Sequence, residues 1–304
     1  MSLKNIVIAL MVFGSTSTVF GQQDPLYSQY LLNQSMINPA YTGINDVFNA
    51  TLFARNQWVG LEGAPQTNTL NASASIINNK VGVGLLVSRD AYGVNKNTEY
   101  QLMYSYKIDL LNGRSLSFGL QTGYIDYRYD YDNLVLEQSD QALELVDAEV
   151  TKVNFGSGIF FKTNQFYLGA SVPRMLNMES RSANGTTTVH QRHYYVSAGY
   201  VFDQFIALKF KPSALIKIVE GQPISVDLNA RFLLLESLWV GATIRNFNAV
   251  GINSQFEFND MFRLGYSFEY PLNAVGTNTF GTHELMFSVD LELFKNNAIG
   301  RRYF

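Results

Sequence analysis

The residues best suited to chemistry are few in this 304-residue chain. It has three histidines and no cysteine, which excludes thiolate metal sites, iron–sulfur clusters, disulfides and cysteine nucleophiles. His190 and His193 are three residues apart on a predicted strand, so they point to opposite faces and cannot share one metal ion. His283 stands alone, and no Gly-x-Ser-x-Gly elbow is present. We therefore expect neither an enzyme nor a cofactor.

Two other groups of residues resemble ligand sites. Asp140, Glu144 and Asp147 belong to an acidic stretch, 130–149, in which a calcium site is one interpretation. Their spacing is not that of an EF-hand, so a solvated external loop is favoured. Gly82-Val83-Gly84 and Gly156-Ser157-Gly158 resemble fragments of phosphate loops, but neither completes a Walker motif. Glycines of strands in a crowded barrel explain them better.

Residues 1–21 have the pattern of a secretory signal peptide. Lys4 precedes eight apolar residues at 6–13, and we predict cleavage between Gly21 and Gln22. This apolar run is too short for a transmembrane helix, and no other window approaches the required length. The only membrane-spanning structure left is a closed β-barrel.

The rest of the chain alternates apolar and polar side chains with a period of two. The pattern runs for 8–11 residues in 98–109, 224–234, 261–270 and 283–293, which predicts strands long enough to cross a bilayer at a tilt. Charged residues make up only 15 % of the chain and aromatic residues 14 %. The net charge is −3, so the composition gives no sign of the basic surface that binds nucleic acid. The charges that we expect to face the lumen are Lys107, Asp227, Arg231, Arg245, Glu257 and Glu284.

We predict an antiparallel outer-membrane barrel of about 14 strands, because the connections between strands sort by length. Short turns alternate with connections that are mostly long, and the long ones are 59–67, 89–96, 130–149, 173–189 and 271–281. Short periplasmic turns and long external loops are typical of such barrels, and an even strand number leaves both termini in the periplasm. A secreted soluble β-protein, with the apolar face inside, is the alternative.

The predicted domains are the signal peptide (1–21), an N-terminal segment (22–46) and the barrel (47–304). The Asn38-Pro39 pair breaks any helix in the N-terminal segment. The lumen of a barrel of this size is wide enough for water. The sequence leaves open whether the segment plugs this lumen or is a periplasmic tail.

Several motifs together resemble one family of membrane proteins. They include Asn38-Pro39-Ala40-Tyr41-Thr42-Gly43, Arg55-Asn56-Gln57-Trp58-Val59-Gly60, Lys211-Pro212-Ser213, Trp239-Val240-Gly241 and Arg301-Arg302-Tyr303-Phe304. With these motifs the chain resembles the PorP/SprF family of Bacteroidetes outer-membrane proteins. The resemblance implies a Gram-negative outer-membrane barrel tied to the type IX secretion system and, in many members, to gliding motility.

The resemblance also implies partners. They are outer-membrane lipid and either secretion-system components or a large secreted adhesin that the barrel anchors at the cell surface. Residues 130–149 and 173–189 do not match the family pattern, and loops carry specificity on a rigid scaffold. The candidate docking residues are Asn38, Pro39, Ala40, Tyr41, Asp140, Glu144, Asp147, Arg174 and Arg181. The alternative function is an outer-membrane diffusion channel or small-solute transporter.

Overall fold

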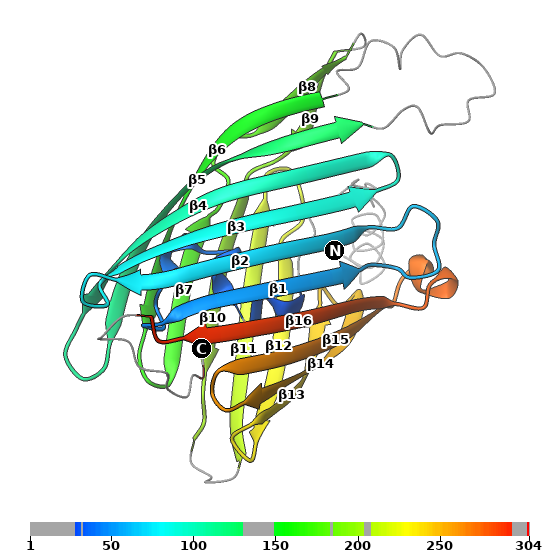
Figure 1. Cartoon of the computed structure of the whole chain (residues 1–304). Helices are drawn as coiled ribbons and strands as arrows, with labels where there is room; N and C mark the ends of the chain where they lie inside the picture. Colours follow the sequence, from blue (N-terminus) through cyan, green and yellow to red (C-terminus); the bar gives the residue numbers. More distant parts are fainter. Residues whose placement is uncertain are drawn as a thin grey trace, which may run out of the picture.

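Fourteen strands form one closed antiparallel barrel in the computed structural model, which describes residues 28–31, 33–129, 149–182, 185–203, 208–293 and 303 (Figure 1). The ring closes where β1 (Phe48–Asn56) pairs with β16 (Thr282–Leu291), from Phe48 opposite Leu291 to Asn56 opposite His283. The predicted fold class is therefore confirmed. No helix in the described part of the chain is long and apolar enough to span a membrane.

The other strands follow one another around the ring, except for one pair that lies outside it. The barrel strands are β2 (Gln66–Ile76), β3 (Val81–Tyr92), β4 (Asn95–Asp109), β5 (Ser115–Tyr129), β6 (Glu149–Lys162), β7 (Phe166–Val172), β10 (His193–Tyr200), β11 (Leu208–Val219), β12 (Ser225–Leu234), β13 (Leu238–Arg245), β14 (Ala249–Phe258) and β15 (Phe262–Pro271). β8 (Met178–Ser182) and β9 (Gly185–His190) form a separate two-stranded sheet.

Side chains alternate between the two faces of the barrel wall, as the period of two predicts. On β12, Asp227 and Arg231 are 1 % and 2 % exposed, whereas Leu228 and Phe232 are 43 % and 39 % exposed. Polar groups therefore fill the inside, and aliphatic and aromatic side chains cover the outside. This is the arrangement of a barrel in a bilayer. It is the reverse of the soluble alternative, whose apolar face would be buried.

The two ends of the barrel differ in their connections. At one end, here called the turn end, strands are joined by tight turns such as 77–80 and 235–237, where Asn78, Asn79, Leu235 and Glu236 have positive φ. Paired positive φ values suit the twist of a hairpin. The opposite end, here called the loop end, carries the connections 57–65, 93–94, 173–192, 220–224, 246–248 and 272–281. The last of the long connections contains the 3₁₀ turn η5 (Ala274–Asn278).

Two of the predicted long loops differ from the structure. The prediction for 89–96 was wrong, because β3 continues to Tyr92 and β4 starts at Asn95, with Asp90 opposite Asn97. The outward side chains of this hairpin are no longer apolar at 89–96. The alternation of apolar and polar residues therefore stops there, and a sequence without alternation predicts a loop. Residues 173–189 contain β8 and β9 as far as Val189, and their polar sequence gave no strand signal. His190 ends β9 and His193 begins β10, so the prediction that these two histidines share one strand was wrong. The loop predicted at 130–149 lies, up to residue 148, outside the described residues.

Candidate functional site

The described part of the N-terminal segment, residues 28–31 and 33–46, lies inside the barrel. It contains the 3₁₀ turns η1 (Ser28–Leu31), η2 (Gln34–Met36) and η3 (Pro39–Tyr41), and it runs into β1 at the turn end. These turns are the dark-blue pieces inside the ring in Figure 1. We call residues 33–47 the lumenal segment. Its contacts with the inner wall place it within the barrel rather than in a free tail.

Asn38 fastens the lumenal segment to the wall. Its Oδ1 caps η3 by accepting from the Ala40 amide at 2.9 Å, and its Nδ2 donates to the Ile159 carbonyl at 3.0 Å. Two glycines of the wall make this approach feasible. A Cβ on Gly158 would lie 2.1 Å from Asn38 Oδ1, and a Cβ on Gly119 would lie 2.1 Å from the Ala40 nitrogen. Only glycine fits where two backbones come this close.

Next to the site where Asn38 contacts β6, an aromatic cluster packs the lumenal segment against the wall. Tyr41 meets Phe160 edge to face with ring centroids 5.2 Å apart, and Phe160 stacks on Tyr167 at 5.6 Å. Ala40 and Ile44 complete the cluster, and all five side chains are buried. Aromatic pairs of this geometry contribute about 0.5–1.5 kcal/mol beyond the area they bury.

Polar contacts fix the upstream part of the segment to other strands. Asn33 Nδ2 donates to Asn71 Oδ1 at 3.0 Å, and Ser171 Oγ donates to the Ile37 carbonyl at 2.6 Å. Still further upstream, Tyr30 accepts from Asn229 Nδ2 at 3.0 Å. The N-terminal turns are therefore tied to β2, β6, β7 and β12, around much of the ring.

The charges expected in the lumen form a network near the loop end. Arg55 pairs with Glu284 at 2.9 Å and with Glu269 at 3.8 Å. Arg245 pairs with Glu269 at 2.9 Å and with Asp227 at 3.1 Å. The network joins β12, β13, β15, β16 and β1, and its carboxylates are almost completely buried. Charges removed from water in this way require partners.

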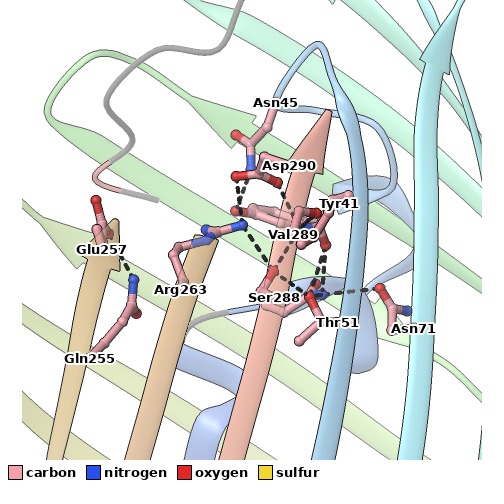
Figure 2. Close-up of polar contacts among 12 residues, drawn as sticks. Tyr41, Asn45, Thr51, Asn71, Gln255, Glu257, Arg263, Ser288, Val289 and Asp290 are labelled. Carbon is pink, nitrogen blue, oxygen red and sulfur yellow. Dashed lines mark hydrogen bonds and ion pairs between the residues drawn. The ribbon is translucent and has the colours of Figure 1, made fainter. Parts of the chain in front are cut away.

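A second polar group joins β1, β15 and β16 nearer the turn end (Figure 2). Arg263 pairs with Asp290 at 2.8 Å and donates to Ser288 Oγ at 3.2 Å. Ser288 in turn shares a hydrogen bond of 2.8 Å with Thr51. A cavity of about 20 Å³ lies beside Arg263, between the lumenal segment and the wall. This volume holds about one water molecule.

The remaining expected lumen charges lie inside the barrel as well. Lys107 pairs with Asp46, which follows the lumenal helical turns. Arg231 lies 4.8 Å from the Trp239 ring centroid and donates to Gln255, which donates to Glu257. Figure 2 shows the last contact, between Gln255 and Glu257.

The structure places the candidate docking residues in three different settings. Asn38, Pro39, Ala40 and Tyr41 are buried in the lumen. The guanidinium of Arg174 is bound to Glu99 of β4, and Arg181 belongs to β8 opposite Thr186. Asp140, Glu144 and Asp147 lie outside the described residues, as do Gly21 and Gln22 at the predicted cleavage site.

Two histidines occupy different environments. His193 points inward and stacks near Tyr195, and His283 on the outer face is hydrogen-bonded to Tyr266 at 2.8 Å. Among the described residues no group of three His, Cys, Asp or Glu side chains is placed to hold a metal ion.

Sequence reasoning missed several members of the lumenal networks. Arg55 was not placed on a lumenal face, although it occupies an inward position near the loop end of its strand, whereas the alternation did put Glu99 and Glu269 on polar faces. The position of Arg55 in the alternation was the available signal. The lysines Lys209 and Lys211 of β11 were missed in the same way.

Comparison with known proteins gives the family. A model described as "Type IX secretion system membrane protein PorP/SprF" matches residues 19–289. The CymD monoaromatic hydrocarbon channel shares 9 % identity and a TM-score of 0.52, over 90 % of this chain and 95 % of that chain. Omp33 of Acinetobacter baumannii shares 10 % identity and a TM-score of 0.46, over 83 % of this chain and 100 % of that chain. The likeness to CymD shows the fold alone.

No curated protein matches the sequence. The family match nevertheless covers most of the chain, and the closed barrel with an apolar outer face is the architecture of an outer-membrane protein. The chain therefore belongs to the PorP/SprF family of type IX secretion system membrane proteins.

Proposed function

We propose that this chain is a non-enzymatic scaffold of the type IX secretion system, which docks a machine component or a large secreted adhesin and conducts no solutes. One observation carries the proposal. The lumen is occupied by residues 33–47, which are held by hydrogen bonds to both Asn71 and Ile159 on different parts of the wall. An occupied lumen suits a barrel that presents surfaces to proteins better than one that passes small molecules.

The surface proposed for docking is at the loop end and includes the β8–β9 hairpin. Among the described residues, β8 and β9 pair only with each other, and Figure 1 shows them at the top of the view. Its base is fastened by Arg174 Nε, which donates to Glu99 at 2.8 Å, and by Asn154 Nδ2, which donates to the Leu176 carbonyl at 2.8 Å. A projecting element with a fixed base is a suitable platform for a protein partner.

The orientation follows from the same asymmetry. β1 begins and β16 ends at the turn end, so both ends of the barrel domain are there. Barrels of this class place tight turns in the periplasm. The proposed orientation therefore has both termini in the periplasm and the β8–β9 hairpin outside the cell.

Planar-bilayer conductance tests the closed lumen. We expect the intact protein to give little stable conductance, and a variant that lacks residues 28–45 to give a larger one. The loss of the segment removes the contacts of Asn33, Asn38 and Tyr41 and leaves the ring of strands unchanged. Large, stable conductance by the intact protein would instead support the channel alternative.

Affinity purification from outer membranes tests docking. Replacing residues 178–190 by a short Gly-Ser linker removes only the separate sheet, so heat-modifiable gel mobility should persist while partner capture is lost. A matched control carries the same linker inserted at 110–114, a turn at the opposite end where Leu111 is 87 % exposed. Equal capture by the hairpin variant and the control would contradict docking by the hairpin.

A further inference from the structure

Tyr303 lies in the barrel interior, although it follows the end of β16 by twelve residues. Its hydroxyl is hydrogen-bonded to Lys209 Nζ, which also lies 4.3 Å from the centroid of its ring. Its carbonyl accepts from Lys211 Nζ at 2.5 Å. One residue thus engages two neighbouring inward lysines of β11 through its phenol, its ring and its backbone.

The surroundings of the two lysines are aromatic and cationic. Lys211 Nζ lies 5.8 Å from the Trp239 ring centroid and 5.7 Å from that of Tyr167, and Arg231 faces the same indole. Lys209 also reaches Glu236 at 3.3 Å. Ammonium groups have three donors and no acceptor, and they bind carbonyl oxygens, phenols and ring faces. Tyr303 supplies one of each.

The Tyr303 contact and the contacts of the lumenal segment lie near the same end of the barrel but on different strands. Near the turn end, the segment packs against β5, β6 and β7 through Ala40, Tyr41 and Asn38. Lys209 and Lys211 belong to β11, which begins at the same end. Lys209 is 9 % exposed and Lys211 is 2 % exposed, so both amines are covered.

We propose that Lys209 and Lys211, with Trp239 behind them, form a receptor site for Tyr303 of the same chain. The ligand is a tyrosyl residue bound through its hydroxyl, ring face and carbonyl. When bound, Tyr303 shields the two amines from solvent on the β11 side of the turn end, and we call this contact the Tyr303 latch. One segment from before β1 and one residue from after β16 then both contact the inner wall.

Amine labelling of the folded, full-length protein followed by mass spectrometry tests the latch. In Tyr303→Ala we expect labelling of Lys209 and Lys211 to rise several-fold. Lys217 is the internal control, because it lies inward on the same strand, near the loop end, and is 3 % exposed. Unchanged labelling of Lys209 and Lys211 would overturn the proposal. So would an equal rise at Lys217, because it would show a general loosening of the barrel.

A second measurement does not remove the aromatic ring. A benzophenone amino acid placed at position 303 should crosslink, on irradiation, to β11 near Lys209 and Lys211 or to Trp239. The conservative Tyr303→Phe variant retains the ring and the carbonyl, so labelling should rise at Lys209 and stay unchanged at Lys211. Crosslinks confined to other strands, or to other molecules, would refute the assignment.

Discussion

Asn38 Nδ2 donates to the carbonyl of Ile159 at 3.0 Å, across a sequence separation of 121 residues. The same side chain caps η3 through its other amide atom. One asparagine therefore sets both the local conformation of the lumenal segment and its attachment to the wall. The two functions use different atoms, so substitutions can separate them.

Asn38→Ala should loosen the lumenal segment by about 1–3 kcal/mol, because it removes both the cap of η3 and the hydrogen bond to the Ile159 carbonyl. The measurement is hydrogen exchange at the Ala40 amide, which Asn38 Oδ1 accepts from. Asn38→Asp keeps the capping oxygen and loses the donor, so exchange should be intermediate. Asn248→Ala, at an exposed turn, is the matched control. Wild-type exchange in Asn38→Ala would contradict the proposed role.

Gly119→Ala should displace η3 from its position against the barrel wall, because the added Cβ would lie 2.1 Å from the Ala40 nitrogen. Such a contact forces backbone to move. The expected result is faster proteolysis within 33–47 and an unchanged heat-modifiable shift of the barrel. In a variant that lacks 28–45, Gly119→Ala should have no further effect on barrel stability, because Ala40, with which the new Cβ would clash, is absent. A large effect in that background would place the clash within the wall itself.

Glu284→Gln should destabilise the barrel by about 3–5 kcal/mol, because it leaves Arg55 buried with only the longer contact to Glu269. The double variant Arg55→Met/Glu284→Met should recover much of this loss, since neither member of the pair then leaves a buried charge without its partner and Glu269 keeps its contact with Arg245. Urea titration of the protein folded into vesicles gives the free energies. Arg128→Met is the control, because Arg128 is 61 % exposed in its pair with Asp126 and should cost less than about 1 kcal/mol.

Leu228→Lys should cost about 2–4 kcal/mol, because Leu228 faces outward near the middle of β12. Phe247→Lys is the matched control. Phe247 is 73 % exposed in the 246–248 turn at the loop end, and a lysine there should cost about 0–1 kcal/mol. The same urea titration measures both. Equal costs would mean that the hydrocarbon layer does not centre on the middle of the strands.

The sequence predicted the wall of the barrel well, because each strand must show one face to lipid and the other to the lumen. That requirement fails near the loop end of the β3–β4 hairpin, where the outward residues Arg89 and Thr98 still pair but are polar. The prediction of a loop at 89–96 failed for this reason. The position of the lumenal segment could not be predicted from the periodicity of the sequence either. The 3₁₀ turns of the N-terminal segment are three or four residues long, which is too short for a repeating pattern of apolar residues.

The alternation of the sequence also predicted on which face of the wall each charged side chain lies, but it did not predict the residue with which that side chain forms an ion pair. Arg55 and Glu284 meet only because the first strand pairs with the last, a contact that spans 229 residues. A side chain's face follows from its own strand, whereas its partner depends on how the whole ring closes. Tyr303 shows the same limit, since nothing local to residue 303 indicates a binding site on β11.

The pairing of β1 with β16 also sets an order of events during assembly. The seat for Asn38 is made by β6 and does not exist until half the chain has been inserted. The ring cannot close before β16 arrives, and after closure the lumenal segment can leave only through an end of the barrel. Residues 33–47 can therefore make their full set of wall contacts only once the strands that carry those contacts are in place.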